Sequence, residues 1–266
     1  MQTPQPSVEH DEEGVVALRG INSRLIDLAG SRYRCDSFNA EGCRMEEASL
    51  RHCRLFAGLG EDILNECCSR FAAVRVESGD SVALQGATCS RFLIVVRGLL
   101  QLRRLTAEGR EFTVRISRPG DFLGDEGMLG YAEYAVSAVA LIDSVVAFCP
   151  SGYARELLVR QPQLALNYAR CVREYHDCDV AKYEEASSNR VRHRLLRLLR
   201  EFATECGVLE PGGTTIDLPL THDLLGSLIG AQRETVTAAL TALTRSGEIA
   251  RRGRRIVLPL RSGQAA

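Results

Sequence analysis

The sequence predicts an α+β protein with a β-rich N-terminal part, a long helix and a C-terminal pair of short helices. Short β-rich runs alternate with glycine-containing turns between 74 and 150, and apolar residues recur at helical spacing after Pro162. Near the C-terminus, two short helical runs flank Gly230. The 266 residues suffice for two compact domains and a linking element.

Charge is distributed unevenly along the chain. The formal net charge is −1, yet residues 187–266 carry 12 Lys and Arg against 7 Asp and Glu, while the rest carries 21 against 27. A basic part behind an acidic one is typical of a nucleic-acid-binding module attached to another domain. The first residues do not resemble a signal peptide and no apolar run reaches membrane-spanning length, so we expect a cytoplasmic protein with no membrane association.

These signals divide the chain into four expected parts. They are a cysteine-containing extension (1–49), the β-rich domain (50–160), the long helix with its hinge (161–187) and the C-terminal domain (188–266). In the β-rich domain, the predicted strands lie within 92–96, 112–116 and 136–148. Many short strands at this spacing predict an antiparallel barrel or roll.

The long helix is predicted to run from Pro162 to about Ala186. Residues at successive steps of four and three along it are Leu164, Tyr168, Cys171, Tyr175, Cys178 and Lys182. This is the a/d spacing of a coiled coil, so we expect the helix to form a homodimer interface. The alternative is a helix that packs on its own β-rich domain.

The C-terminal domain is predicted to begin its key segment at Thr221, a good helix N-cap. Gly230 suits the tight turn between two helices, and the second helix runs from Gln232 to about Thr244. The inward face of that helix is predicted to consist of Val236, Ala239, Leu240 and Leu243. Two short strands, 248–250 and 256–258, complete a winged helix-turn-helix.

The outward residues of the second helix have side chains that can read DNA bases. Arginine can donate two hydrogen bonds to guanine, and glutamate can accept one from cytosine. The wing arginines around Gly253 suit phosphate contacts. The candidate DNA-binding residues are Thr221, Gln232, Arg233, Glu234, Thr237, Arg251, Arg252 and Arg254. The alternative for Arg233 and Glu234 alone is a solvated first turn.

The run Gln232-Arg233-Glu234-Thr235-Val236, with the helix before it and the wing after it, resembles the DNA-binding domain of the CRP/FNR family, the cyclic-AMP receptor protein and fumarate-nitrate regulators. The resemblance extends in order of elements over about residues 50–260. It implies a homodimeric transcriptional regulator that binds a palindromic site in double-stranded DNA, acts with RNA polymerase and has a cyclic-nucleotide-binding-like β-roll. Ala238 stands where both branches of the family have a further arginine, so we expect the target to differ, or to be read less tightly, at the base pair that this arginine would contact.

The residues of the β-roll argue against cyclic AMP as the effector. Gly124-Asp125 resembles half of the family's nucleotide site, with aspartate in place of glutamate. Tyr134-Ala135 falls where an arginine and a serine would hold the cyclic phosphate, and neither residue can do so. Asp179-Val180 falls where hydroxyl residues would face the purine.

The cysteines suggest a different signal. In the FNR branch, N-terminal cysteines bind an oxygen-sensitive 4Fe-4S cluster, and the resemblance implies Cys35, Cys43 and Cys53 as ligands here, with Cys149 as the fourth. Their spacing is wider than in that branch, and Cys67 or Cys68 are alternatives for the fourth position. Thiol redox sensing, zinc, haem and unrelated free cysteines remain open.

No catalytic motif is visible, so we do not expect an enzyme. A Gly-rich phosphate loop, H-E-x-x-H and G-x-S-x-G are all missing from the sequence. The competing function is a small-molecule sensor or interaction protein whose C-terminal domain binds protein in place of DNA.

Overall fold

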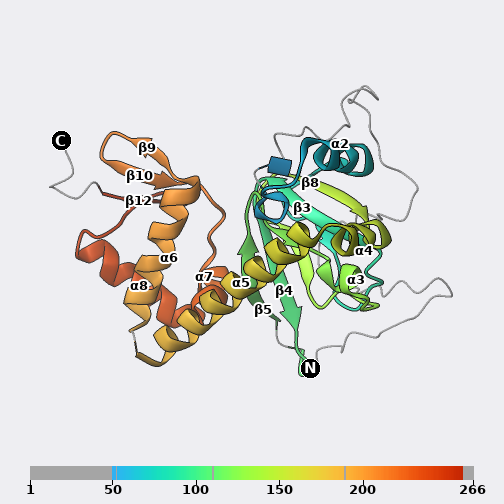
Figure 1. The fold of residues 1–266 in the computed structure, drawn as a ribbon. Coiled ribbons are helices and arrows are strands. Elements are labelled where there is room, and N and C mark those ends of the chain that lie inside the picture. Colours follow the sequence, from blue (N-terminus) through green and yellow to red (C-terminus); the bar gives the residue numbers. More distant parts are fainter. Residues whose placement is uncertain (1–49, 52, 110, 189, 260–266) are drawn as a thin grey trace. The chain divides into compact units, whose positions relative to one another are not determined.

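The computed structural model describes residues 50–259, except 52, 110 and 189 (Figure 1). The chain forms two compact units, Met1–Cys171 and Val172–Ala266. The predicted α+β class is confirmed, with a β-rich first unit, a long helix and a helix-turn-helix in the second unit. In the described part of the chain, no helix has the length and apolar character needed to cross a membrane.

The first unit contains a β-roll made of two four-stranded antiparallel sheets. In spatial order the first sheet consists of β1 (Ala72–Val76), β8 (Ser144–Pro150), β3 (Arg91–Arg97) and β6 (Phe122–Leu123). The second consists of β2 (Ser81–Ala83), β7 (Ser137–Ala140), β4 (Leu100–Leu105) and β5 (Glu111–Ser117). The run predicted as one strand over 136–148 is therefore two strands, because residues 141–143 bend between β7 and β8.

Strand β3 lies between two apolar clusters, which explains its unbroken apolar run. Successive strand residues point to opposite faces. Leu93 and Val95 belong to the core inside the roll. Phe92 contacts Phe71 and Phe122 on the other face, with ring centroids 6.5 and 5.7 Å apart. Because both faces of β3 are buried, apolar and polar residues do not alternate along the strand.

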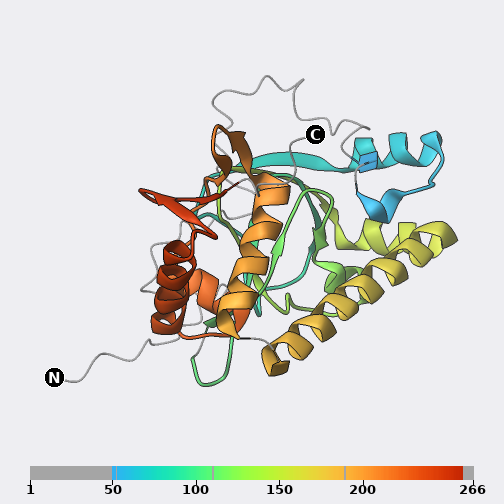
Figure 2. The same cartoon turned by 90° about the vertical axis from the view of Figure 1, so that its left-hand side faces the viewer.

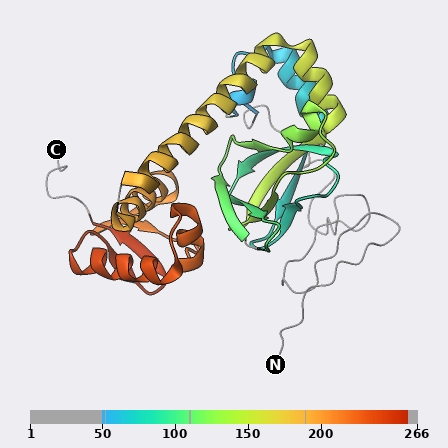
Figure 3. The same ribbon diagram turned by 90° about the horizontal axis from the view of Figure 1, so that it is seen from below.

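Among the described residues, several helical segments complete the first unit, and the last of them continues into the second unit. They are η1 (Arg54–Phe56), α2 (Glu61–Arg70), α3 (Asp125–Leu129), α4 (Ser151–Arg160) and α5 (Pro162–Ser188). Figure 3 shows α5 as one continuous helix that follows α4. Helix α4 was not predicted as a separate element, whereas the start of α5 at Pro162 was predicted.

The first turns of α5 pack on the unit's own residues. Leu164 and Cys171 are buried, and Tyr168 is half-buried. Asn167 donates hydrogen bonds to the carbonyl oxygens of Leu55 and Ala57, at 3.0 and 2.7 Å. The predicted dimer seam is thus wrong over Leu164, Tyr168 and Cys171, because this face is covered by the chain itself.

The described part of the second unit contains the C-terminal part of α5, further helices and a small sheet (Figure 2). The helices after α5 are α6 (Val191–Cys206), α7 (His222–Ile229) and α8 (Arg233–Arg245). Its antiparallel sheet has the order β11 (Ala250–Arg252), β12 (Arg255–Leu258), β10 (Gly213–Ile216) and β9 (Val208–Glu210). The fully buried Leu195, Leu199 and Phe202 of α6 contribute to the core of this unit.

Candidate nucleic-acid interface

Helix α7 and the turn after it form as predicted. Thr221 is the N-cap, and its Oγ1 accepts a hydrogen bond from the Leu224 amide at 3.1 Å. Gly230 ends the helix in the left-handed region with φ 63°. Gly226 lies so close to the turn that a Cβ there would be 2.5 Å from the Ala231 carbonyl oxygen. Glycine at these two positions therefore allows the close approach of α7 and α8.

Helix α8 separates an inward face from an outward one. Val236, Ala239, Leu240 and Leu243 are buried, as predicted. The exposed residues of its first turns and N-cap are Gln232, Arg233, Glu234, Thr235, Thr237 and Ala238. Every predicted candidate on α8 therefore lies on the accessible side, where a helix can present side chains to a groove.

Two contacts join the outward face of α8 to the first turn of α7. Arg233 NH1 lies 3.5 Å from Asp223 Oδ2, and Thr237 Oγ1 lies 2.8 Å from His222 Nδ1. His222 and Asp223 were not predicted as site residues. The signal available in the sequence was their place directly after the N-cap of the first helix, where side chains are near the start of the second.

The wing is a tight hairpin in the same unit. Arg252 pairs with Arg255 across a two-residue turn, Gly253-Arg254, with Gly253 at φ 63°. The predicted first strand, 248–250, begins too early. The amides of Glu248 and Ile249 both donate to the Leu243 carbonyl oxygen, so these residues terminate α8 before β11 starts at Ala250.

The wing arginines are exposed and two of them have acidic neighbours. Arg251, Arg252 and Arg254 lie on the surface, as expected for candidate phosphate contacts. Arg252 NH1 lies 3.4 Å from Glu210 on β9, and Arg255 NH2 lies 2.7 Å from Asp217. Exposed pairs of this kind contribute little to folding, so DNA phosphates can replace the carboxylates.

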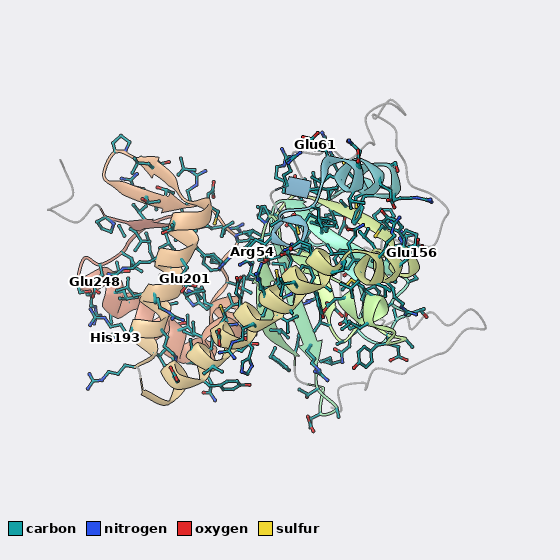
Figure 4. All side chains as sticks on the ribbon, viewed as in Figure 1. Arg54, Glu61, Glu156, His193, Glu201 and Glu248 are labelled. Carbon is teal, nitrogen blue, oxygen red and sulfur yellow. The ribbon has the colours of Figure 1, made fainter. Side chains whose placement is uncertain are left out.

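An ion pair fixes the segment between α8 and the wing. Arg192 of α6 pairs with Glu248, which is labelled in Figure 4. Hydrogen bonds from Ser246 and then Arg192 hold the pKa of Glu248 below its usual range. The base of the wing is thereby tied to the helix that packs behind α8.

The segment that resembles half of a nucleotide site contacts the protein itself. Asp125 Oδ2 accepts a hydrogen bond from Tyr168 at 2.8 Å. The Tyr134 side chain is buried in the core of the roll, and its hydroxyl donates to the Arg91 carbonyl oxygen at 3.0 Å. Gly124 backs directly onto this ring, since a Cβ there would be 3.2 Å from Tyr134 Cε1. The tyrosine ring thus fills the space beside Gly124.

The candidate metal ligands are only partly described. Cys35 and Cys43 lie outside the described residues. Cys53 and Cys149 are fully buried. Burial raises the pKa of the Cys53 thiol to about 12 and also raises the pKa of Cys149. Both thiols are therefore protonated in the metal-free chain, whereas the ligands of an iron-sulfur cluster are thiolates.

No metal centre is assembled in the region the structure describes. Within residues 50–259, apart from the gaps, no three His, Cys, Asp or Glu side chains converge on a point that could hold a metal ion. Cys149 lies near Cys67 and Cys53 near Cys171, since each neighbour contributes to the raised pKa. Cys178 and Cys206, in contrast, belong to the second unit.

Comparison with known proteins agrees with this architecture. Residues 73–161 match the cyclic nucleotide-binding domain family, and residues 189–263 match the Crp-like helix-turn-helix domain family. The cyclic AMP receptor protein of Thermus thermophilus is 31% identical over 73% of this chain and 87% of its own length. The transcriptional regulator SdrP of the same organism is 30% identical over 66% and 84%.

Solved structures show the same fold. The global regulator CLP of Xanthomonas campestris has a TM-score of 0.66 over 76% of this chain and all of its own, at 18% identity. A CRP/FNR-family regulator of Thermus thermophilus has a TM-score of 0.58 over 70% and 92%, at 29% identity. The fold and the helix-turn-helix define a transcriptional regulator. The chain belongs to the CRP/FNR family.

Proposed function

We propose that this regulator binds a palindromic DNA site as a homodimer, with Arg233 and Glu234 contacting bases. The observation that carries the proposal is the outward face of α8, where both side chains are exposed beside four buried core residues. Gln232 and Thr237 extend this face, and Thr221 orders the helix in front of it. Such a helix supplies base contacts from its N-terminal end.

The wing supplies affinity that does not depend on sequence. Arg251, Arg252 and Arg254 are exposed on one hairpin, and each phosphate contact adds to the salt dependence of binding. The proposed setting is cytoplasmic, with RNA polymerase as the further partner of the bound regulator. We propose no catalytic activity for the chain.

We propose that the dimer forms through a face of α5 other than the predicted one. In the second unit, Val172, Val180 and Tyr183 are exposed by 41, 39 and 77%. With His176 they follow steps of four, four and three, so they form one stripe along the helix. Exposed apolar residues in a helical row favour a partner helix, and a second copy with the same stripe is self-complementary.

The β-roll is proposed not to respond to cyclic AMP. Tyr134 stands inside the roll and donates its hydroxyl to backbone, while Ala135 has no side chain that could bind a phosphate. A cyclic phosphate needs charged or hydrogen-bonding groups at these positions. The relative from Thermus thermophilus is named a cyclic AMP receptor protein, but these residues do not support that ligand here.

The predicted 4Fe-4S cluster stays a prediction. Its ligands would be Cys35 and Cys43 together with the buried Cys53 and Cys149. Protein purified without oxygen should contain iron and acid-labile sulfide if the cluster exists. Cys43→Ser should then lose both, and Cys206→Ser should retain both. Metal-free protein that still binds its DNA would leave thiol oxidation or a small molecule as the signal.

The test of the proposed function is binding to duplex DNA selected by the full chain from a random pool. We expect a palindromic consensus and an affinity that falls steeply with salt. Arg252→Ala should weaken all sequences equally and lower the salt slope by about one. A C-terminal domain that binds protein in place of DNA would select no consensus.

A further inference from the structure

The first turn of α7 holds two outward residues of α8, as described above for Asp223 with Arg233 and His222 with Thr237. We propose that Asp223 is a positioning residue that retains Arg233 when the base it reads is absent. Asp223 would thereby set how strictly the protein discriminates between DNA sequences. This inference rests on the proposed base-reading role of Arg233.

A hydrogen bond holds the backbone of Arg233, and an ion pair holds its guanidinium. Thr237 has one hydroxyl hydrogen, which it donates to the Arg233 carbonyl oxygen at 2.9 Å. Towards His222, the Thr237 oxygen therefore acts as an acceptor, and His222 Nδ1 carries the hydrogen. The backbone of Arg233 is fixed through Thr237, while its guanidinium contacts Asp223.

The contact with Asp223 is weak enough to be exchanged. The Arg233 and Asp223 side chains are 66 and 68% exposed, so water screens their attraction. Guanine offers two acceptors in a geometry that fits the guanidinium, so the correct base can draw Arg233 away from Asp223. A base pair without this acceptor pattern cannot draw Arg233 away, and the guanidinium then stays beside the Asp223 carboxylate.

The consequence is a penalty against wrong sites. Without Asp223, a released guanidinium can contact phosphates of any sequence. With Asp223 in place, that alternative is suppressed, and a negative charge stays beside the base-reading residue on mismatched DNA. Specificity is a difference between affinities, and a device that weakens wrong partners increases it.

A purely structural role for Asp223 predicts a different result. A carboxylate in the first turn of α7 complements the positive end of the helix. Its loss would then alter folding, and it would change binding to all DNA by the same factor. The two roles are separated by the ratio of affinities for two DNAs.

The experiment measures affinity for two DNAs. One is the selected site, and the other is the same site changed at one base pair, the pair at which Arg233→Ala loses its sequence preference. In wild-type background, Asp223→Asn should raise affinity for the variant site roughly 3- to 10-fold more than for the selected site, as expected for coupled neighbours. In Arg233→Ala background, Asp223→Asn should change both affinities by the same factor. Asp223→Glu keeps the charge and should keep the discrimination.

The matched control is Asp217→Asn, which removes the same charge beside wing residue Arg255. It should change the two affinities equally. If Asp223→Asn also changes them equally in wild-type background, the positioning role is wrong. If Arg233→Ala weakens both DNAs alike, the base-reading role itself fails, which is a separate result. Thermal unfolding without DNA checks folding, and Asp223→Ser gives the same comparison should Asp223→Asn unfold.

Discussion

Tyr168 of α5 donates a hydrogen bond to Asp125 of α3, with 2.8 Å between the two oxygens. Its ring also lies 5.8 Å from that of Phe122. The helix that was predicted to present Tyr168 to a second subunit therefore uses it inside its own domain. Asp125 belongs to the segment that resembles a nucleotide site, so α5 and that segment are directly connected.

The first prediction concerns this connection. Tyr168→Phe removes the hydroxyl and leaves Asp125 without this partner, so the free energy of unfolding should fall by about 1 kcal/mol. Urea unfolding measures the change, and sedimentation should show an unchanged oligomeric state. If Tyr168→Phe instead dissociated the dimer and left the free energy of unfolding unchanged, Tyr168 would belong to the dimer interface.

The second prediction concerns dimerisation through the exposed stripe Val172, His176, Val180 and Tyr183. Val180→Glu adds a charge to this apolar face and should shift the protein to monomers in sedimentation measurements, with an unchanged unfolding temperature of the domains. Glu174→Gln, on the opposite side of α5 from the stripe, is the control and should remain dimeric. A dimer that survives Val180→Glu would place the interface elsewhere.

The third prediction concerns cyclic AMP. A ligand present at about 100 times its Kd stabilises the folded state by about 2.7 kcal/mol. Because Tyr134 and Ala135 provide no phosphate site, we expect no change in unfolding temperature with cyclic AMP. A rise that saturates with concentration would contradict this.

The fourth prediction follows from the buried Cys53 thiol, whose pKa is raised to about 12 from a usual value near 9.0. As pH rises past 9, the unfolded chain releases this proton while the folded chain keeps it. Unfolding is therefore favoured increasingly between pH 9 and 12. Urea unfolding of Cys53→Ala should show a smaller loss of stability from pH 8 to pH 10 than wild type.

The control for this pH effect is Cys178→Ala, since Cys178 is exposed. It should lose as much stability as wild type over the same pH interval. An identical loss in Cys53→Ala would mean that other groups account for the pH dependence.

Local signals made the helix-turn-helix predictable from sequence. Thr221 caps α7, Gly230 has a positive φ, and the apolar spacing from Val236 to Leu243 fixes the inward face of α8. Each depends on neighbours in the chain, so a single sequence contains the necessary information. The family resemblance, which rested on the same residues, is confirmed.

Features set by distant contacts could not be predicted. The a/d spacing of α5 showed which residues share a face, but it could not show that Asn167 and Tyr168 meet residues 55, 57 and 125. The hairpin of β9 and β10 is too short to give a periodic signal. The contacts of His222 and Asp223 depend on the angle between α7 and α8, which the sequence pattern does not specify.

Arg233 is proposed to read a base pair. The most direct measurement compares the affinity of Arg233→Ala and wild type for the selected site and for random duplex DNA at one salt concentration. We predict a loss of about 1–3 kcal/mol on the selected site, little change on random DNA and a relaxed preference at one base pair. An equal loss on both DNAs would contradict base reading and reduce Arg233 to a phosphate contact.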